Sequence, residues 1–363
     1  MGLNITIVGL GQTGTAIGAA LKRTRADLKL TGHDRDHDAA RRAQKAGCVD
    51  RTDWNLIGAC DGADLVILSI PLEGIRATLQ AMGPELKKGC VVTDTASVKT
   101  PVLAWAKETL PGHIFFVGGH PIPSQRGDET SQATDVLTGG TWCLAPAPNV
   151  PREAIQRVSA LVEAVGARPY YVDAAEHDGL IAAVELLPAV IAAALQLVAG
   201  GSPSRRELQR LSGTHFVATT QPLSPDPGKL AEMCLANRTN LVRWLDILLN
   251  QLAELRTLVA EGQREAIQKV LEQAVKMHDS WAVSELDQGE PVDYSAFSTA
   301  RIMMGDLFDP AIRLRIVLVA EMPGLAMWRL GNSGEKRACQ TNRSPSLHPL
   351  GRIVACAERT TFS

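Results

Sequence analysis

Three glycines near the start of the chain are spaced so that they could hold a phosphate. Gly9, Gly11 and Gly14 follow an apolar run at residues 5–8 and precede a helical pattern at residues 15–22. In a strand–turn–helix unit, the first glycine permits a tight turn, the second lets the backbone approach a pyrophosphate, and the third allows close helix packing. Free N–H groups and the dipole at the helix start attract the phosphate charge. We therefore expect a dinucleotide-binding turn made of Gly9, Leu10, Gly11, Gln12, Thr13 and Gly14, with a plain glycine-rich turn as the alternative.

An acidic residue stands where such a turn needs one. Asp34 lies twenty residues past Gly14, after a second predicted strand at residues 28–31. A carboxylate in this position accepts hydrogen bonds from the ribose hydroxyls and repels a 2′-phosphate, so NAD is favoured over NADP. Arg35 follows directly, and it could soften that preference or be a solvated charge beside the adenine.

A second group of residues could transfer a proton. His120 follows a predicted strand at residues 115–118, and Ser97 follows another at residues 90–94. An imidazole titrates near neutrality, so His120 could accept a proton in a transition state. Ser97 could orient that imidazole or hold a substrate hydroxyl. The alternative is that His120 is a turn histidine bonded to the backbone.

The elements that must position these residues alternate along the first half of the chain. Strand-like runs at residues 65–71, 90–94, 115–118, 141–144 and 170–172 alternate with helical patterns at 72–82, 100–109 and 152–165. This alternation predicts an α/β fold of the Rossmann type, a doubly wound, mostly parallel sheet with helices on both faces, over residues 1–172. Ligands bind outside the carboxyl ends of such strands, where Ser69, Pro71 and Thr95 lie, so we expect these residues to contact the cofactor.

From about residue 173 the strand signals disappear. Helical patterns at 176–200, 204–215, 227–261 and 262–280 predict an all-helical domain over 173–305, and several lack a polar face, which favours packing against a partner subunit. Residues 180–199 are almost wholly apolar but contain Glu185 and Pro188, so we expect burial between helices or subunits rather than a membrane span. Residues 306–363 are expected to be a poorly ordered extension, or else a partner-binding arm.

Composition narrows the class of protein. The chain has 363 residues, 45% hydrophobic and 21% charged, which is enough for two domains. A net charge of −2 and a pI of about 6.5 favour neither nucleic acid nor an anionic membrane as a partner. Seven cysteines without paired spacing, and a first strand that begins at once, predict a reduced, cytoplasmic protein without a signal peptide or a zinc site. Residues 176–178 (Glu-His-Asp) point in different directions on a helix, so we interpret them as a helix-start cap and charge cluster rather than metal ligands.

Several motifs together resemble a known family. The glycine turn, the segments at residues 93–99 and 116–121, the Glu-His-Asp at 176–178 and the Leu-Ala-Asn-Arg at 235–238 occur in the order seen in prephenate and arogenate dehydrogenases. The resemblance covers about residues 3–290. It implies a nucleotide-binding domain followed by a helical dimerisation domain, and hence a homodimeric oxidoreductase of aromatic amino acid (tyrosine) biosynthesis.

The resemblance also implies a reaction. A cyclohexadienol would be oxidatively decarboxylated with hydride transfer to the nicotinamide, and aromatisation would drive the reaction, so the protein need mainly position the substrate and accept a proton. Carried over by motif, His120 would be the base that binds the ring hydroxyl, and Ser97 its supporting partner.

The chain departs from the family at positions that the resemblance implies bind the substrate. The residues after Gly-His-Pro, at 122–126, lack the usual Met-Ala-Gly, and residues 185–189 lack both histidines of Ser-His-Leu-Pro-His. The family's carboxylate-binding arginine is replaced by Gln221, which cannot form a bidentate ion pair. Arg126 or His215 could supply the missing positive charge. Two other functions therefore stay open: a related NAD-dependent dehydrogenase with a different small substrate, and a decayed NAD-binding protein.

Overall fold

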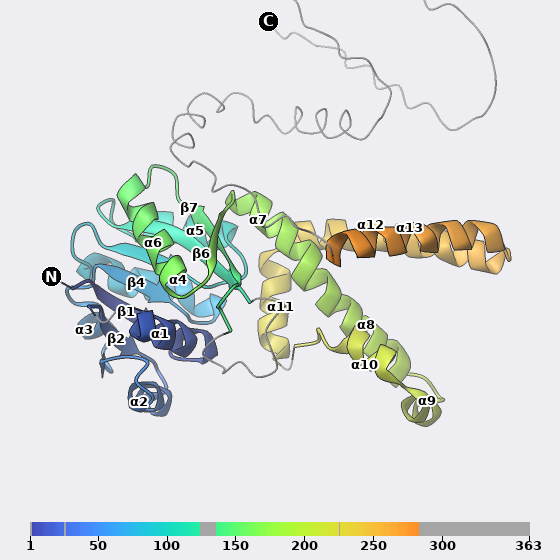
Figure 1. The fold of residues 1–363 in the computed structure, drawn as a ribbon, viewed down its shortest axis with the longest axis horizontal. Coiled ribbons are helices and arrows are strands. Elements are labelled where there is room, and N and C mark those ends of the chain that lie inside the picture. Colours follow the sequence, from blue (N-terminus) through green and yellow to red (C-terminus); the bar gives the residue numbers. More distant parts are fainter. Residues whose placement is uncertain (1, 25–26, 124–135, 225, 283–363) are drawn as a thin grey trace, which may run out of the picture. The chain divides into compact units, whose positions relative to one another are not determined.

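The computed structural model describes residues 2–24, 27–123, 136–224 and 226–282 (Figure 1). The chain divides into two compact units, Met1–Val275 and Lys276–Ser363, and of the second only residues 276–282 are described. The expected extension at 306–363 and the candidate cation Arg126 therefore lie outside the described residues.

The first part of the chain builds one sheet. Its strands are β1 (Asn4–Val8), β2 (Lys29–His33), β3 (Arg51–Thr52), β4 (Leu65–Leu68), β5 (Val91–Asp94), β6 (Phe115–Ile122), β7 (Thr141–Pro146) and β8 (Arg168–Tyr171). They lie in the order β3-β2-β1-β4-β5-β6-β7-β8, and every neighbouring pair is parallel except β6–β7. The predicted doubly wound, mostly parallel sheet is confirmed. The direction of winding reverses between β1 and β4, the point where such sheets bind ligands.

Helices cover both faces of this sheet (Figure 1). They are α1 (Gln12–Thr24), α2 (His37–Lys45), α3 (Leu56–Cys60), α4 (Leu72–Met82), α5 (Thr100–Thr109) and α6 (Arg152–Ala164), with a 3₁₀ turn, η1, at Gly83–Glu85. Successive side chains of a strand point to opposite faces. Leu65 and Ile67 of β4 accordingly pack in the core with α1 and α6, whereas Val66 and Leu68 pack in the core with α4 and α5.

Strand β6 is longer than its sequence pattern predicts. Its parallel pairing with β5 ends at Val117, but residues 117–122 continue as the antiparallel partner of β7, with His120 opposite Cys143. His120 therefore lies within a strand rather than in a turn after one. It still lies beyond the last pair of β5 and β6, at the carboxyl edge of the parallel sheet.

The described part of the chain after β8 is all-helical, as expected. Its elements are α7 (Ala174–Ile181), the π-helical turn η2 (Ala182–Leu186), α8 (Leu187–Gly200), α9 (Arg205–Leu211), α10 (Thr214–Thr220), α11 (Pro227–Ala236), α12 (Arg238–Ala260) and α13 (Arg264–Ala282). The single helix predicted over 227–261 is interrupted at Asn237, which has a φ of −116°. The π turn precedes Pro188, whose ring lacks an N–H and would clash with the carbonyl of the preceding turn in a regular α-helix.

The apolar segment 180–199 is only partly buried by the residues that the structure describes. The helical stretch that contains it, Ala174–Gly200, is long and apolar enough to cross a membrane, with a mean hydropathy of 2.2 over an 18-residue window. Only 28% of that window is buried. Leu197 and Val198 are 76% and 74% exposed. Burial between helices of the described chain is therefore only partial, and burial between subunits, the other part of the expectation, stays a prediction.

Candidate functional site

The glycine turn has the local geometry that its sequence predicts. Gly9 has a φ of +95°, in the region that favours glycine, and its N–H donates to the His33 carbonyl at 2.8 Å. A Cβ on Gly14 would lie 1.9 Å from the Gly9 carbonyl oxygen, so α1 packs against the turn closely. A Cβ on Gly11 would meet nothing within 4 Å, which leaves its backbone open to an approaching group.

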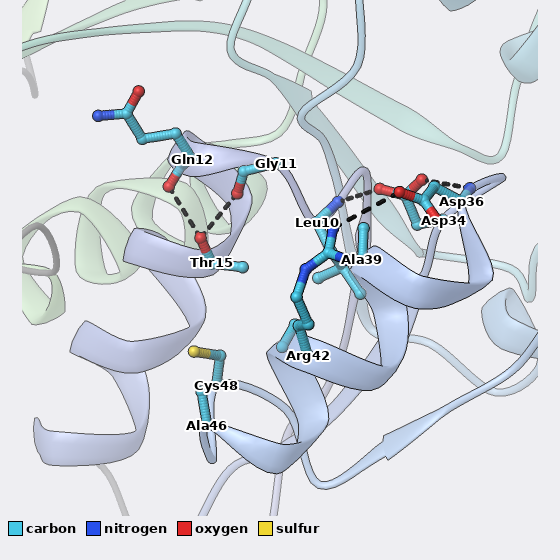
Figure 2. A pocket seen from close by; sticks show the side chains of 11 residues that line it. Leu10, Gly11, Gln12, Thr15, Asp34, Asp36, Ala39, Arg42, Ala46 and Cys48 are labelled. Atoms are coloured by element: carbon cyan, nitrogen blue, oxygen red, sulfur yellow. Dashed lines mark hydrogen bonds and ion pairs between the residues drawn. The ribbon is translucent and has the colours of Figure 1, made fainter.

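Asp34 lies beside this turn at the end of β2. Its carboxylate accepts hydrogen bonds from the Leu10 N–H at 2.7 Å and the Asp36 N–H at 2.8 Å (Figure 2). A cavity of about 660 Å³ opens next to it, within the usual size of small-molecule sites. The cavity is lined by Leu10, Gly11, Gln12, Thr15, Asp34, Asp36, Ala39, Arg42, Ala43, Ala46 and Cys48.

Thr15 and Arg42 line this cavity, although neither was predicted from the sequence as a cofactor-binding residue. Thr15 donates to the Gly11 carbonyl at 2.7 Å, and Arg42 forms a 3.5 Å ion pair with Asp36 (Figure 2). Arg35 is exposed and is not among the lining residues. The spacing of polar residues predicts the polar face of α2, but it does not indicate which of them lines the cavity.

The other predicted cofactor residues lie at the ends of neighbouring strands. The Ser69 N–H donates to the Val8 carbonyl at 2.7 Å, and the Thr95 N–H donates to the Leu68 carbonyl at 3.0 Å. Pro71 is the N-cap of α4. The ends of β1, β4 and β5 thus form one edge of the sheet, and cofactor contacts by these residues stay a prediction.

His120 is buried near this edge, with a different partner from the one expected. It is 4% exposed, and its Nδ1 lies 3.1 Å from Nε2 of His177 on α7. Its Nε2 lies 3.6 Å from Oε1 of Glu185 on η2. Burial, reinforced by the neighbouring His177 ring and the charge of Lys99, holds the pKa of His120 well below its ordinary value of 6.5. His120 is therefore neutral at pH 7, the state in which an imidazole can accept a proton. Ser97 is half-buried in the loop after β5, and its support of His120 stays a prediction.

Residues 176–178 do not form the helix-start cap predicted for them. Asp173 caps α7, accepting from the Ala175 N–H at 2.9 Å. His177 and Asp178 are instead 1% and 3% exposed, and His177 Nδ1 lies 3.0 Å from Asp178 Oδ1. Sequence spacing could not reveal that His177 and Asp178 are buried, because their other partners come from β6 and the start of α5.

A buried ion pair supports the strand that carries His120. Lys99 and Asp94 pair with no side-chain exposure, and Lys99 Nζ also donates to the Gly119 carbonyl at 2.6 Å. Asp94 Oδ1 accepts from the Gly119 N–H at 3.0 Å. Both backbone groups of the residue before His120 are therefore held by this pair. Burial lowers the pKa of Lys99, whereas the charge of Asp94 opposes that shift.

Glu185 is the functional candidate that the sequence reasoning overlooked. Burial raises the pKa of its carboxyl to about 7, and the charge of Lys229 on α11 opposes the rise. The available signal was an acid inside an otherwise apolar helix, which is uncommon unless the acid has a partner or a role. Of the two cations proposed from the sequence, His215 is exposed on α10, and Arg126 lies outside the described residues.

No group of three or more His, Cys, Asp or Glu side chains in the described ranges is arranged to hold a metal ion. The five cysteines that the structure describes (Cys48, Cys60, Cys90, Cys143 and Cys234) are all free thiols.

Comparison with known proteins agrees with this architecture. A model of the prephenate dehydrogenase nucleotide-binding domain matches residues 17–171, and one of the prephenate dehydrogenase dimerization domain matches residues 173–273. The cyclohexadienyl dehydrogenase of Zymomonas mobilis is 29% identical over 260 residues, 71% of this chain and 88% of that protein. The prephenate dehydrogenase of Bacillus subtilis is 24% identical over 76% of this chain and 75% of that protein.

Solved structures give the same result. The arogenate dehydrogenase of Synechocystis matches with a TM-score of 0.66 and 25% identity, covering 77% of this chain and all of that chain. The prephenate dehydrogenase of A. aeolicus, in complex with hydroxyphenyl propionate and NAD⁺, has a TM-score of 0.69 and 24% identity, covering 77% of this chain and 98% of that chain. The latter likeness supports the fold.

Proposed function

The chain belongs to the prephenate dehydrogenase family, and from this premise we propose that it oxidatively decarboxylates prephenate or arogenate, a step of tyrosine biosynthesis. The expected family and the expected class, a dehydrogenase that uses a nicotinamide cofactor, are both confirmed. The observation that carries the proposed mechanism is a buried, neutral His120 beyond the end of β5, at the same sheet edge as the glycine turn.

In this reaction His120 acts as the base. The ring hydroxyl gives its proton to Nε2 of His120, the nitrogen that faces Glu185 rather than His177. A nicotinamide cofactor held at the glycine turn would supply the acceptor for the hydride that leaves the ring carbinol carbon. The bond to the ring carboxylate breaks, its electron pair completes the aromatic ring, and carbon dioxide leaves. Because aromatisation supplies the driving force, the residues of the chain serve to position the substrate and to take the proton.

We infer that the cofactor is NAD rather than NADP. The pyrophosphate would lie on the open backbone of Gly11 at the start of α1, and the adenosine end would enter the cavity beside Asp34. The Asp34 carboxylate would accept from the ribose hydroxyls and repel a 2′-phosphate. Gly9, Thr13 and Gly14 would shape the turn, and Ser69, Pro71 and Thr95 would lie toward the nicotinamide.

The substrate carboxylate needs a cation that Gln221 cannot supply. Lys229 on α11 acts electrostatically on both His120 and Glu185, so its charge reaches the proposed reaction site. We propose that Lys229 attracts the carboxylates of the substrate. Lys229→Met should then raise KM for the substrate about tenfold, the effect of about 1.4 kcal/mol, with little change in kcat. An unchanged KM would contradict this role, and Lys269→Met, an exposed lysine on α13, is the matched control.

The helical part matches a dimerization domain, which supports assembly as a homodimer. We propose that the exposed apolar residues of α8 are covered in that dimer rather than by a membrane, and that the protein is cytoplasmic with no nucleic-acid partner. The proposed domains are 1–172 for the cofactor, 173–305 for the substrate and the dimer, and 306–363 as an extension.

The test is a coupled assay of NADH and carbon dioxide with prephenate and with arogenate. We expect equal release of both products with at least one substrate, and a loss of about 100-fold or more in kcat for His120→Asn, the scale of lost general-base catalysis. His113→Asn, an exposed histidine, is the control and should keep full activity. Binding of NAD without product from either substrate would refute the proposed function.

A further inference from the structure

A continuous chain of buried polar groups leads from His120 into the helical part. His120 Nδ1 is 3.1 Å from His177 Nε2, and His177 Nδ1 is 3.0 Å from Asp178 Oδ1. The two rings are close to perpendicular, with an interplanar angle of 82° and centroids 5.2 Å apart. All three residues are less than 5% exposed, so bulk water does not compete for these hydrogen bonds.

Asp178 can only accept hydrogen bonds in this arrangement. Its Oδ1 accepts from the Lys99 N–H at 2.6 Å, and its Oδ2 accepts from the Thr100 N–H at 2.8 Å, at the start of α5. These N–H groups and His177 keep the pKa of Asp178 below its ordinary value despite burial. An ionised carboxylate has no hydrogen to donate, so the hydrogen between Asp178 and His177 is on His177 Nδ1.

That assignment determines the next one. We take His177 as the neutral imidazole, which carries its one ring hydrogen on Nδ1 and accepts at Nε2. The hydrogen between the two rings is then on His120 Nδ1. His120 Nε2 is left without a hydrogen, and it faces Glu185 at 3.6 Å rather than the interior of the chain.

We propose that His177 and Asp178 are positioning residues that hold His120 in the tautomer with hydrogen on Nδ1, so that Nε2 is ready to accept a proton. The use of that proton acceptor rests on the proposed function, but the tautomer does not. Neither residue touches the reacting atoms in this scheme. Both act through His120, as the carboxylate of a catalytic triad acts through its histidine.

The first experiment reads the tautomer directly. The full-length protein is labelled with ¹⁵N-histidine, and two-bond ¹⁵N–¹H spectra are recorded at pH 8, with His120→Gln and His177→Gln used to assign the two rings. We expect hydrogen on Nδ1 and a bare Nε2 in both rings. In His177→Phe, which keeps a ring but removes the acceptor, His120 should change to the tautomer with hydrogen on Nε2. Hydrogen on Nε2 of His120 in the unaltered protein, or no change in His177→Phe, would overturn the proposal.

The second experiment measures the consequence for turnover. His177→Phe should lower kcat by about 100- to 10,000-fold, the range seen when a triad histidine is held in the wrong tautomer, while Kd for NAD changes less than about threefold. His177→Gln offers an amide oxygen to His120 Nδ1 and should recover at least about tenfold of that loss. His113→Phe, at an exposed histidine, should behave as the unaltered protein.

The outcomes separate this inference from the function on which it builds. If His177→Phe retains full kcat, or if the Gln variant is no better than the Phe variant, the positioning role is refuted. If the unaltered protein turns over neither substrate, the proposed function fails, and the tautomer spectra decide the positioning role without it.

Discussion

The buried pair of Lys99 and Asp94 makes a strong prediction about stability. Substituting Lys99→Met keeps the length and apolar volume of the side chain but removes its charge. The buried Asp94 carboxylate still accepts hydrogen bonds from the Ala96 and Gly119 N–H groups, but it loses its counterion. The Gly119 carbonyl loses its charged donor as well.

The magnitude follows from these contacts. Removing one partner of a buried ion pair costs about 3–5 kcal/mol, because the remaining charge is uncompensated. Two backbone donors stay on Asp94, so we expect the lower half of that range, about 3–4 kcal/mol. In a domain of this size, that loss lowers Tm by about 10 °C.

The assay is thermal and urea unfolding at pH 7.5, with Lys107→Met as the matched control. Lys107 lies on the same helix, α5, but is exposed, so its substitution should change the free energy of unfolding by less than about 0.5 kcal/mol. The double variant Asp94→Asn/Lys99→Met should recover about 1–3 kcal/mol, since it no longer buries an unpaired charge. The reasoning is refuted if Lys99→Met costs less than about 1 kcal/mol, or if the double variant is less stable than the single one.

Three further predictions concern other residues of the candidate functional site. Gly119→Ala should destabilise the protein by about 1–3 kcal/mol in thermal unfolding, because the new Cβ would lie 2.5 Å from the Asp94 carbonyl oxygen. Asp34→Asn should shift the ratio of Kd values for NAD and NADP toward NADP by about ten- to a hundredfold in fluorescence titrations, the effect of removing about 1–3 kcal/mol of charge repulsion. Glu185 has a folded pKa of about 7 against 4.5 for the free group, so the folded state gains a proton and its stability falls as pH rises from 4.5 through 7. Glu185→Gln should therefore be more stable than the unaltered protein at pH 8 by about 1–2 kcal/mol, less than the full shift implies because the side chain is 36% exposed.

Matched controls exist for each of these variants. Gly112→Ala adds a Cβ that meets nothing within 4 Å, so a loss equal to that of Gly119→Ala would exclude the steric explanation. Asp38→Asn, on α2 outside the cavity lining, should leave cofactor preference unchanged, and an equal shift there would show a general charge effect. Glu176→Gln, at an exposed acid on α7, is the control for the general effect of losing an acid. If the stability of Glu185→Gln relative to the unaltered protein does not change between pH 4 and pH 8, the raised pKa is contradicted.

Local chemistry in the sequence was sufficient for the elements and the cofactor turn. The bounds predicted for α4 and α5 agree with the structure, because proline precedes the first helix and opens the second, and both helices carry apolar residues at helical spacing. Gly9 and Gly14 have the turn and the close packing that their spacing predicts. These features depend on residues within a few positions of one another, so a single sequence contains the information needed to predict them.

Contacts between distant residues determined the rest of the site. His120 and His177 are 57 positions apart, and Lys99 and Asp178 are 79 apart, so spacing alone could not indicate that α7 buries them together. The position of Glu185 depends on the π turn before Pro188, and the continuation of β6 to Ile122 depends on antiparallel pairing with β7. The sequence by itself thus determined which residues have suitable chemistry and on which elements they lie. Only the tertiary structure decided which nitrogen of His120 faces Glu185 and how much of α8 the other described elements cover, because burial and hydrogen-bond partners arise from packing between elements far apart in the chain.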